Sequence, residues 1–418
     1  MEIPRAGSSR DEVLRRLAEA GGNDARHRDG RLFALVYGID DEHTQLLAES
    51  YGMYISTNGL GAGFVFQSLG RLEEEVIGGT LALLGNPDGA GNITSGGTES
   101  IIMGLRAAKE ARKAAGTLPA APEIVVPASA HPAFEKACAL MDLRLIRTAL
   151  GPDTTADVAA FRAALTPDTI AMAGSAPSYP YGTVDDIPAL AAVAAEAGVH
   201  FHTDACVGAF ALPWLRRAGH PGIPAFDFSV AGVRTISADV HKYGFAARGT
   251  SLVLYRDRAL QRRATFRLGT WVGGPYVTPT LAGSRPGGAI AAAWAVMQRL
   301  GQEGYARLHT ALRQTTEAYM ATVEAAGFRV LGKPPMSLFA FASADPALDP
   351  NAVADEMLAR GWMILRQPTD PPSLHLLLTP RHAQALDDFR RDLGAAVAAV
   401  RASGARSGET STYTRPSS

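Results

Sequence analysis

Short apolar runs alternate with Ala-rich stretches of helical length through the middle of the chain, from about residue 72 to residue 260. The runs are 123–127, 169–174, 199–203, 235–238 and 251–255, and two of the helical stretches between them are 101–115 and 187–197. Continuous apolar runs of strand length are typical of strands that are buried on both faces. The alternation therefore predicts an α/β domain in which helices cover both faces of a mostly parallel central sheet.

The C-terminal part of the chain has a different pattern. Residues 288–326 are Ala-rich with apolar residues at helical spacing, which predicts one or two long helices. Strand-like runs at 328–331, 336–342, 362–365 and 373–378 follow, with helical stretches at 351–359 and 383–400. We therefore expect an N-terminal segment (1–65) that wraps over the large domain or a partner, a large domain (66–310), a small C-terminal α+β domain (311–401) and a disordered polar tail (402–418).

The composition fits a globular protein and excludes several other classes. Hydrophobic residues make up 47% of the 418 residues, charged residues make up 19%, and 40 basic residues nearly balance 41 acidic ones. This balance argues against a nucleic-acid-binding protein or a polybasic membrane patch. The two cysteines, Cys138 and Cys206, are too few for a disulfide framework or a structural zinc site, so we expect no metal. Without a signal-peptide core or an apolar run of 18 residues, we expect a cytoplasmic protein that has no transmembrane segment.

A glycine-rich motif, Thr-Ser-Gly-Gly-Thr-Glu-Ser at 94–100, lies directly before the helical stretch 101–115. The N–H groups and the dipole of a helix N-terminus favour an anion, and glycine lets a phosphate approach the backbone. Gly96, Gly97 and Thr98 are therefore candidates for a phosphate site. The alternative is a structural one, in which Thr98 caps the helix and the two glycines form a turn.

Three polar residues with candidate chemistry also follow predicted strands. Asp204 could keep a pyridinium nitrogen protonated, although a lone aspartate here is more often a helix cap or an ion-pair partner. Lys242, next to His241, follows the run 235–238; partial burial there would lower its pKa and make it a nucleophile, whereas a typical lysine is simply solvated. His131 could lie flat against an aromatic ring, or it could be structural. Because strand ends meet at one edge of a parallel sheet, all three could share a site.

The order of these motifs resembles the fold-type I pyridoxal phosphate enzymes, which have the aspartate-aminotransferase-like fold. It is most similar to the sphingosine-1-phosphate lyases of the group II decarboxylase superfamily. The similarity runs from about residue 42 to residue 400. Its most specific segments are ITSGGTESI (93–101), SAHPAFEKA (129–137), HTDACVGAF (202–210), ISADVHKYGFAARGTSLVLYRD (236–257) and YVTPTLAGSRPGG (276–288).

The resemblance implies a role for each candidate residue. Lys242 would hold pyridoxal 5′-phosphate as a Schiff base, His131 would stack on the pyridine ring and Asp204 would pair with the ring nitrogen. The residues implied at the cofactor phosphate are Gly97, Thr98 and His241, with Gly96 beside them.

Further residues are implied near the substrate and at a subunit boundary. Tyr276 matches a family position close to the substrate. The loop that contains Gly283 and Ser284 matches one that reaches the cofactor phosphate of the neighbouring subunit, so a homodimer with shared active sites is implied. Arg248 stands where the family usually has lysine and would bind the substrate phosphate. Many relatives have Pro-His-Gly where this chain has Pro-Tyr-Gly at 180–182.

The implied activity is a retro-aldol cleavage of a phosphorylated 2-amino-3-hydroxy compound such as sphingosine 1-phosphate. Its products would be a long-chain aldehyde and phosphoethanolamine. Two alternatives remain open at this point. An amino-acid decarboxylase would use the same cofactor scaffold, and a non-catalytic regulatory protein would bind the cofactor without using it. The intact Lys242, Asp204 and His131 disfavour the second alternative.

Overall fold

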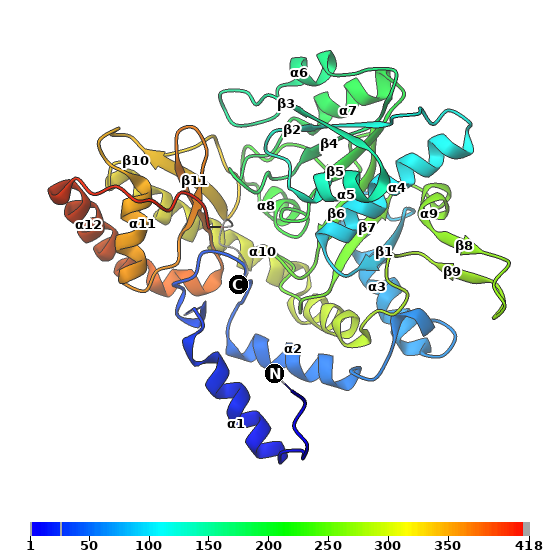
Figure 1. Ribbon diagram of the computed structural model, residues 1–418, viewed down its shortest axis with the longest axis horizontal. Helices are drawn as coiled ribbons and strands as arrows, with labels where there is room; N and C mark the ends of the chain where they lie inside the picture. Colours follow the sequence, from blue (N-terminus) through cyan, green and yellow to red (C-terminus); the bar gives the residue numbers. More distant parts are fainter. Residues whose placement is uncertain (1, 26, 413–418) are drawn as a thin grey trace.

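The computed structural model describes residues 2–25 and 27–412, and its main feature is a seven-stranded sheet in the order β1-β7-β6-β5-β4-β2-β3 (Figure 1). The strands of this sheet are β1 (Ala90–Thr94), β2 (Glu123–Pro127), β3 (Arg144–Thr148), β4 (Thr169–Ser175), β5 (His200–Asp204), β6 (Val233–Asp239) and β7 (Ser251–Tyr255). Every residue of β2, β4 and β7 is buried, which is why these strands read as continuous apolar runs.

The strand directions bring several strand ends to one edge of the sheet. The neighbours among β2 to β6 are parallel, and β7 runs antiparallel to both β6 and β1. β1 therefore points the same way as the parallel strands. The carboxyl ends of β1, β4, β5 and β6 lie at the same edge, where ligands bind in sheets of this kind. The prediction of a mostly parallel central sheet is confirmed.

Helices cover both faces of the sheet. On one face α4 (Gly97–Ala114) packs on β5, β6 and β7, beside α5 (Ala133–Met141) and α9 (Arg258–Ala264). On the other face α7 (Ile187–Glu196) packs on β4 and β5, with α6 (Val158–Ala163) next to it. A short helix, α8 (Leu212–Arg217), and a hairpin of β8 (Phe266–Leu268) and β9 (Tyr276–Thr278) complete the large domain.

The C-terminal domain has its own four-stranded antiparallel sheet, in the order β10-β11-β13-β12. Its elements are β10 (Phe328–Val330), β11 (Leu338–Ser343), α11 (Pro350–Ala359), β12 (Leu365–Gln367), β13 (Ser373–Leu377), η4 (Pro380–Ala385) and α12 (Leu386–Ser403). The long helix α10 (Gly287–Ala325) joins the two domains, with a break in its helical geometry at Gly301, where φ is 57°. The predicted domain boundary at residue 310 therefore falls inside a helix.

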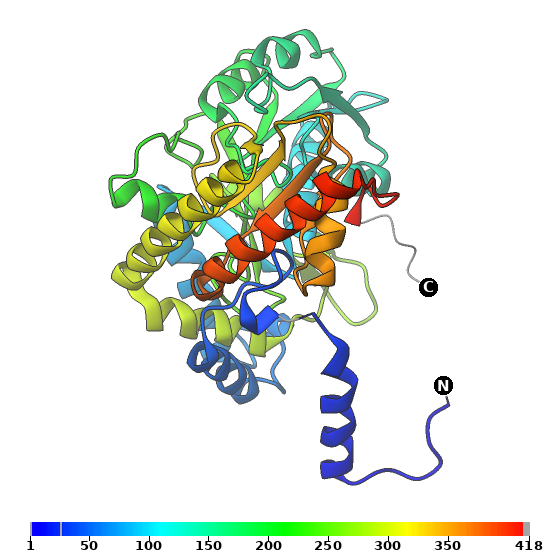
Figure 2. The same cartoon turned by 90° about the vertical axis from the view of Figure 1, so that its left-hand side faces the viewer.

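The N-terminal segment lies over both domains. Its elements are α1 (Arg10–Ala20), η1 (Gly21–Asn23), η2 (His27–Asp29), α2 (Asp41–Met53), η3 (Gly59–Gly61) and α3 (Gln67–Leu83). α2 packs against α10, and Phe33 is fully buried among the rings of Trp362 and Phe389 in the C-terminal domain. α1 buries none of its residues and projects from the body of the molecule (Figure 2).

Several element predictions need correction. α4 begins at Gly97 rather than at residue 101, so the glycine-rich motif forms its first turn. The tail expected to be disordered from residue 402 packs on the C-terminal domain as far as Thr412, because Asp349 and Arg366 form hydrogen bonds with polar groups of the tail. The Thr412 hydroxyl, for example, accepts from Arg366 N. Residues 413–418 lie outside the described residues. Within the described residues, no helix combines the length and apolar character that crossing a membrane requires.

Candidate active site

Polar side chains converge on a cavity of about 180 Å³ at the carboxyl edge of the sheet. They come from the first turn of α4 and from the carboxyl ends of β2, β4, β5 and β6 or the segments that follow them. The polar residues that line the cavity are Thr98, His131, Ser175, Tyr179, Asp204, Cys206, Asp239, His241 and Lys242, and Gly97 lies among them. The structure thus brings Lys242, Asp204 and His131 to one place, as their positions after separate strands predict.

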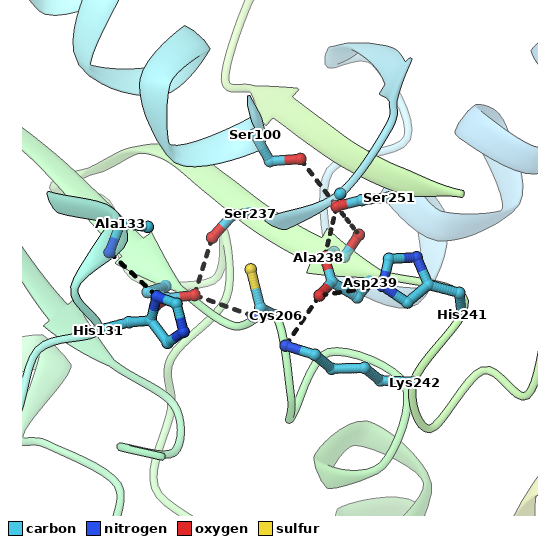
Figure 3. Close-up of polar contacts among 12 residues, drawn as sticks. Ser100, His131, Ala133, Cys206, Ser237, Ala238, Asp239, His241, Lys242 and Ser251 are labelled. Carbon is cyan, nitrogen blue, oxygen red and sulfur yellow. Dashed lines mark hydrogen bonds and ion pairs between the residues drawn. The ribbon is translucent and has the colours of Figure 1, made fainter. Parts of the chain in front are cut away.

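Lys242 forms an ion pair with Asp239, the last residue of β6 (Figure 3). Lys242 Nζ lies 2.9 Å from Asp239 Oδ2, and the Asp239 side chain is only 1% exposed. Burial opposes the charge on the lysine, but Asp239 outweighs it and holds the pKa of Lys242 above its ordinary value. The expectation that partial burial lowers this pKa is wrong, because the buried carboxylate stabilises the ammonium.

Asp239 is a site residue that the sequence analysis missed. Burial would raise its pKa, but Lys242 and His241, together with a hydrogen bond donated by the Ser251 hydroxyl, hold the pKa below its ordinary value. A chain of hydroxyls continues from Ser251 to Ser100, 2.8 Å away (Figure 3). Asp239 lies at the end of a strand, and the same criterion that identified Asp204 as a candidate could have identified Asp239.

Asp204 lines the cavity, and hydrogen bonds from the protein fix one oxygen of its carboxylate. Its Oδ1 accepts hydrogen bonds from Cys206 N (3.1 Å) and from Ser237 Oγ (3.0 Å). Its Oδ2 accepts no hydrogen bond from the described part of the chain. One carboxylate oxygen is therefore anchored in the protein, and the other is left for a donor in the cavity.

His131 lies in the cavity wall just before α5. Its Nδ1 accepts a hydrogen bond from Ala133 N at 3.1 Å, so the proton of the neutral ring is on Nε2 (Figure 3). Although the ring is open to the cavity, desolvation by the surrounding walls lowers the pKa of His131. A neutral, flat imidazole is suited to stacking on an aromatic ring.

The first turn of α4 has the form of an anion site. Gly96, in extended backbone, precedes the helix, and no side chain caps it, so the alternative in which Thr98 is the cap is wrong. Gly96 itself does not line the cavity, whereas Gly97 and Thr98 do. A Cβ on Gly97 would lie 2.6 Å from Cys206 Sγ and 3.0 Å from Asp239 Oδ2, so only glycine keeps this corner open.

A larger cavity of about 930 Å³ adjoins the first and shares His131, Tyr179 and Lys242 with it. Most of its wall is apolar or aromatic. The residues that line it beyond the shared ones include Leu35, Tyr37, Leu150, Tyr181, Arg248, Leu365, Gln367, Thr369 and His375. The guanidinium of Arg248 lies 5.3 Å from the centre of the Tyr37 ring and donates to Leu35 O. Tyr181, which departs from the family pattern, is thus part of this wall.

Three predicted site residues lie elsewhere in this chain. Tyr276 is on β9, and its hydroxyl faces Gly283, where an added Cβ would lie 2.7 Å from it. Ser284 Oγ accepts from Asn58 Nδ2 at 2.9 Å. None of the three lines either cavity of this chain, so the place of Tyr276 close to the substrate stays a prediction. The hairpin carries it away from the sheet edge (Figure 1).

The comparisons with known proteins agree with this geometry. The family model of the pyridoxal-dependent decarboxylase conserved domain matches residues 71–343. The sphingosine-1-phosphate lyase of Arabidopsis thaliana is 41% identical over 401 residues, which cover 94% of this chain and 72% of that protein. The rice sphingosine-1-phosphate lyase is 37% identical, covering 96% and 75%. The solved structure of the Burkholderia pseudomallei sphingosine-1-phosphate lyase matches with a TM-score of 0.91 at 38% identity, covering 96% of this chain and 94% of that one.

Proposed function

The chain belongs to the pyridoxal-dependent decarboxylase family, and on that premise we propose that it cleaves a phosphorylated 2-amino-3-hydroxy compound such as sphingosine 1-phosphate. It is a pyridoxal phosphate-dependent lyase. The products are a long-chain aldehyde and phosphoethanolamine. The observation that carries the proposal is the large apolar cavity that opens directly beside Lys242, with Arg248 in its wall.

The smaller cavity fits pyridoxal phosphate. It combines a lysine, a carboxylate with one oxygen unbonded, a flat neutral histidine and a helix N-terminus kept open by Gly97. Lys242 would hold the cofactor covalently, Asp204 Oδ2 would pair with the ring nitrogen and His131 would lie against the ring. The backbone of Gly97 and the side chains of Thr98 and His241 hold the phosphate. When bound, the cofactor supplies an electron sink for the bond that breaks next to the substrate amine.

The substrate lies in the larger cavity. Its amine is at Lys242, where the two cavities meet, and its chain extends along the apolar wall. Burying a methylene group in such a wall contributes about 0.8 kcal/mol, so a long chain binds much more tightly than a short one. Arg248 is the cation available to the substrate phosphate, and guanidinium pairs well with phosphate.

The active enzyme is a homodimer with shared active sites. Apolar side chains gather in exposed positions on and around the β8–β9 hairpin, and monomeric proteins seldom leave such groups uncovered. The most exposed are Trp271 (53%), Val272 (99%) and Leu281 (53%). Pairing through this hairpin gives Tyr276, Gly283 and Ser284 a place at the partner's cofactor, which their own chain does not give them.

The test is the preference for a phosphorylated, long-chain substrate. We expect kcat/KM to fall steeply when either the phosphate or the chain is removed. Arg248→Ala should raise KM for the phosphorylated substrate about ten- to a hundredfold, while cofactor absorbance stays normal. Arg248→Lys is the matched control and should recover much of the loss. An enzyme indifferent to the phosphate, but active on common amino acids with release of carbon dioxide, would be a decarboxylase instead.

A further inference from the structure

A line of hydrogen-bonded side chains runs through the buried interior of the large domain from Asp204 towards the opposite edge of the sheet. β5 contributes His200, His202 and Asp204, which are alternate residues of the strand and therefore lie on the same face of the sheet. β6, its parallel neighbour, contributes Thr235 and Ser237, which pair in register with His202 and Asp204. Four polar residues of this line, all but His200, are at most 8% exposed.

The contacts along this line are continuous. Ser237 Oγ lies 3.0 Å from Asp204 Oδ1 and 3.2 Å from His202 Nε2. His202 Nδ1 lies 2.8 Å from Thr235 Oγ1, which in turn lies 2.7 Å from His200 Nε2. Each of these groups therefore has a partner on both sides, except at the two ends of the line.

The donor and the acceptor of every hydrogen bond in this line follow from the Asp204 carboxylate at its end. A carboxylate oxygen can only accept, so the Ser237 hydroxyl uses its one hydrogen on Asp204. Ser237 must then accept from His202, which places a proton on His202 Nε2. Burial lowers the pKa of His202 to about 4, so the ring is neutral and its Nδ1 is an acceptor. Thr235 therefore donates to Nδ1 and accepts from His200.

Helix α4 is shaped around this histidine. Gly104, in the interior of α4, faces the ring: an added Cβ would lie 2.7 Å from His202 Nδ1 and 3.3 Å from Thr235 Oγ1. A glycine inside a helix is less favourable than an alanine, so close packing on the imidazole is a reason for glycine here. The Phe134 ring packs edge-on to the imidazole from α5, with 6.1 Å between the ring centres. The imidazole is thus enclosed by two helices and the sheet.

We propose that His202 is a positioning residue which, as the Nε2–H tautomer, fixes Asp204 through Ser237 so that Oδ2 is presented to the cofactor nitrogen. The role rests on the proposed function, because it requires a cofactor at Asp204. His202 touches neither cavity, so it acts only through the aspartate. Two donors on Oδ1, Ser237 and Cys206 N, prevent the carboxylate from rotating when the ring nitrogen binds.

The first experiment concerns the tautomer alone and needs no cofactor. Full-length protein labelled with ¹⁵N in its histidines is compared by long-range ¹⁵N–¹H NMR with His202→Gln, which identifies the signal of His202. We expect the pattern of a neutral ring protonated on Nε2, with and without pyridoxal phosphate. A ring protonated on Nδ1, or on both nitrogens, would overturn the proposal whatever the enzyme's activity.

The second experiment links the histidine to the cofactor. We expect His202→Leu and Ser237→Ala each to weaken pyridoxal phosphate binding about tenfold and to shift the ¹⁵N signal of the cofactor ring towards the neutral form. His202→Gln keeps an N–H donor near Ser237 and should recover most of the affinity. His200→Gln, at the far end of the line, is the matched control and should bind like the wild type.

Ser237→Ala removes only one oxygen, so it keeps the test decisive if His202→Leu does not fold. Wild-type affinity and an unshifted ring-nitrogen signal in Ser237→Ala would overturn the positioning role. A wild-type protein that does not bind pyridoxal phosphate would instead overturn the proposed function, and with it the link to the cofactor. The tautomer measured in the first experiment would stand in that case.

Discussion

The chemistry of the site depends on a few side chains that are far apart in the sequence and are brought together by strand ends. Asp204 ends β5, and His131 and Lys242 follow β2 and β6; a parallel sheet places such positions at one edge. That much could be predicted from the sequence. The Asp239–Lys242 ion pair could not, because the conformation of the turn after β6 decides which side chains three residues apart face each other.

A prediction at this scale concerns the lysine itself. Borohydride should fix the cofactor to Lys242, and peptide mapping should find the label there. Lys242→Ala should lose the absorbance of the bound cofactor, whereas Lys136→Ala, on the exposed side of α5, should keep it. A label found on another lysine would contradict the assignment.

A second prediction concerns the ion pair in protein freed of cofactor. Asp239→Asn leaves the Lys242 ammonium without its partner and should cost about 3 kcal/mol of stability, measured as a lower thermal midpoint. Lys242→Met in the same chain removes the unpaired charge and should restore part of the loss.

The pH dependence of this effect follows from the two pKa shifts. The pKa of Asp239 is lowered, so its contribution is present above about pH 4, the pKa of an unfolded aspartate, and is lost as the pH falls through the folded value. The pKa of Lys242 is raised, so its contribution is complete below about pH 10 and is lost only at higher pH. The difference between wild type and Asp239→Asn should therefore be present in full at neutral pH and be lost at low pH, where Asp239 is protonated in the folded protein. A difference that shrinks near neutral pH would contradict the ion pair.

At the scale of single elements, the buried strands were the most predictable and the edges the least. β2 and β7 have the bounds that their apolar runs indicate. β3 was missed because it is an edge strand, with an exposed arginine at either side of its apolar centre. The start of α4 was misplaced by four residues because Gly96 and Gly97 read as a loop, although the first turn of a helix tolerates glycine.

The first turn of α4 gives the prediction at this scale. Gly97→Ala adds a Cβ that collides with Cys206 Sγ and Asp239, so cofactor affinity should fall at least about tenfold, with KM for the substrate less affected. Gly78→Ala, in the exposed middle of α3 with nothing within 4 Å of the new Cβ, is the control and should be neutral or stabilising. Normal cofactor binding by Gly97→Ala would contradict the prediction that the cofactor phosphate binds at this corner.

At the scale of the whole molecule, the proposal is that a second copy completes the site. The family resemblance implies that Tyr276 lies close to the substrate and that Gly283 and Ser284 reach the cofactor phosphate of the neighbouring subunit. The single chain places all three on and after a projecting hairpin. The resemblance therefore implies a contribution from a second copy for Gly283 and Ser284, whereas for Tyr276 it implies a place near the substrate without saying in which chain.

The proposed dimer gives a prediction of its own. Val272→Asp places a charge on the most exposed apolar residue of the hairpin and should shift sedimentation towards the monomer, with a parallel loss of activity. Leu358→Asp, on α11 and 43% exposed, is the control and should change neither property. An active monomer would contradict shared sites.

The most direct test of the account is product analysis with the purified wild-type enzyme, sphingosine 1-phosphate and pyridoxal phosphate. Mass spectrometry should detect a long-chain aldehyde and phosphoethanolamine in equal amounts, with no carbon dioxide released, and Lys242→Ala should form neither product. Release of carbon dioxide from amino acids, with sphingosine 1-phosphate left intact, would contradict the assignment of the protein as a carbon–carbon lyase.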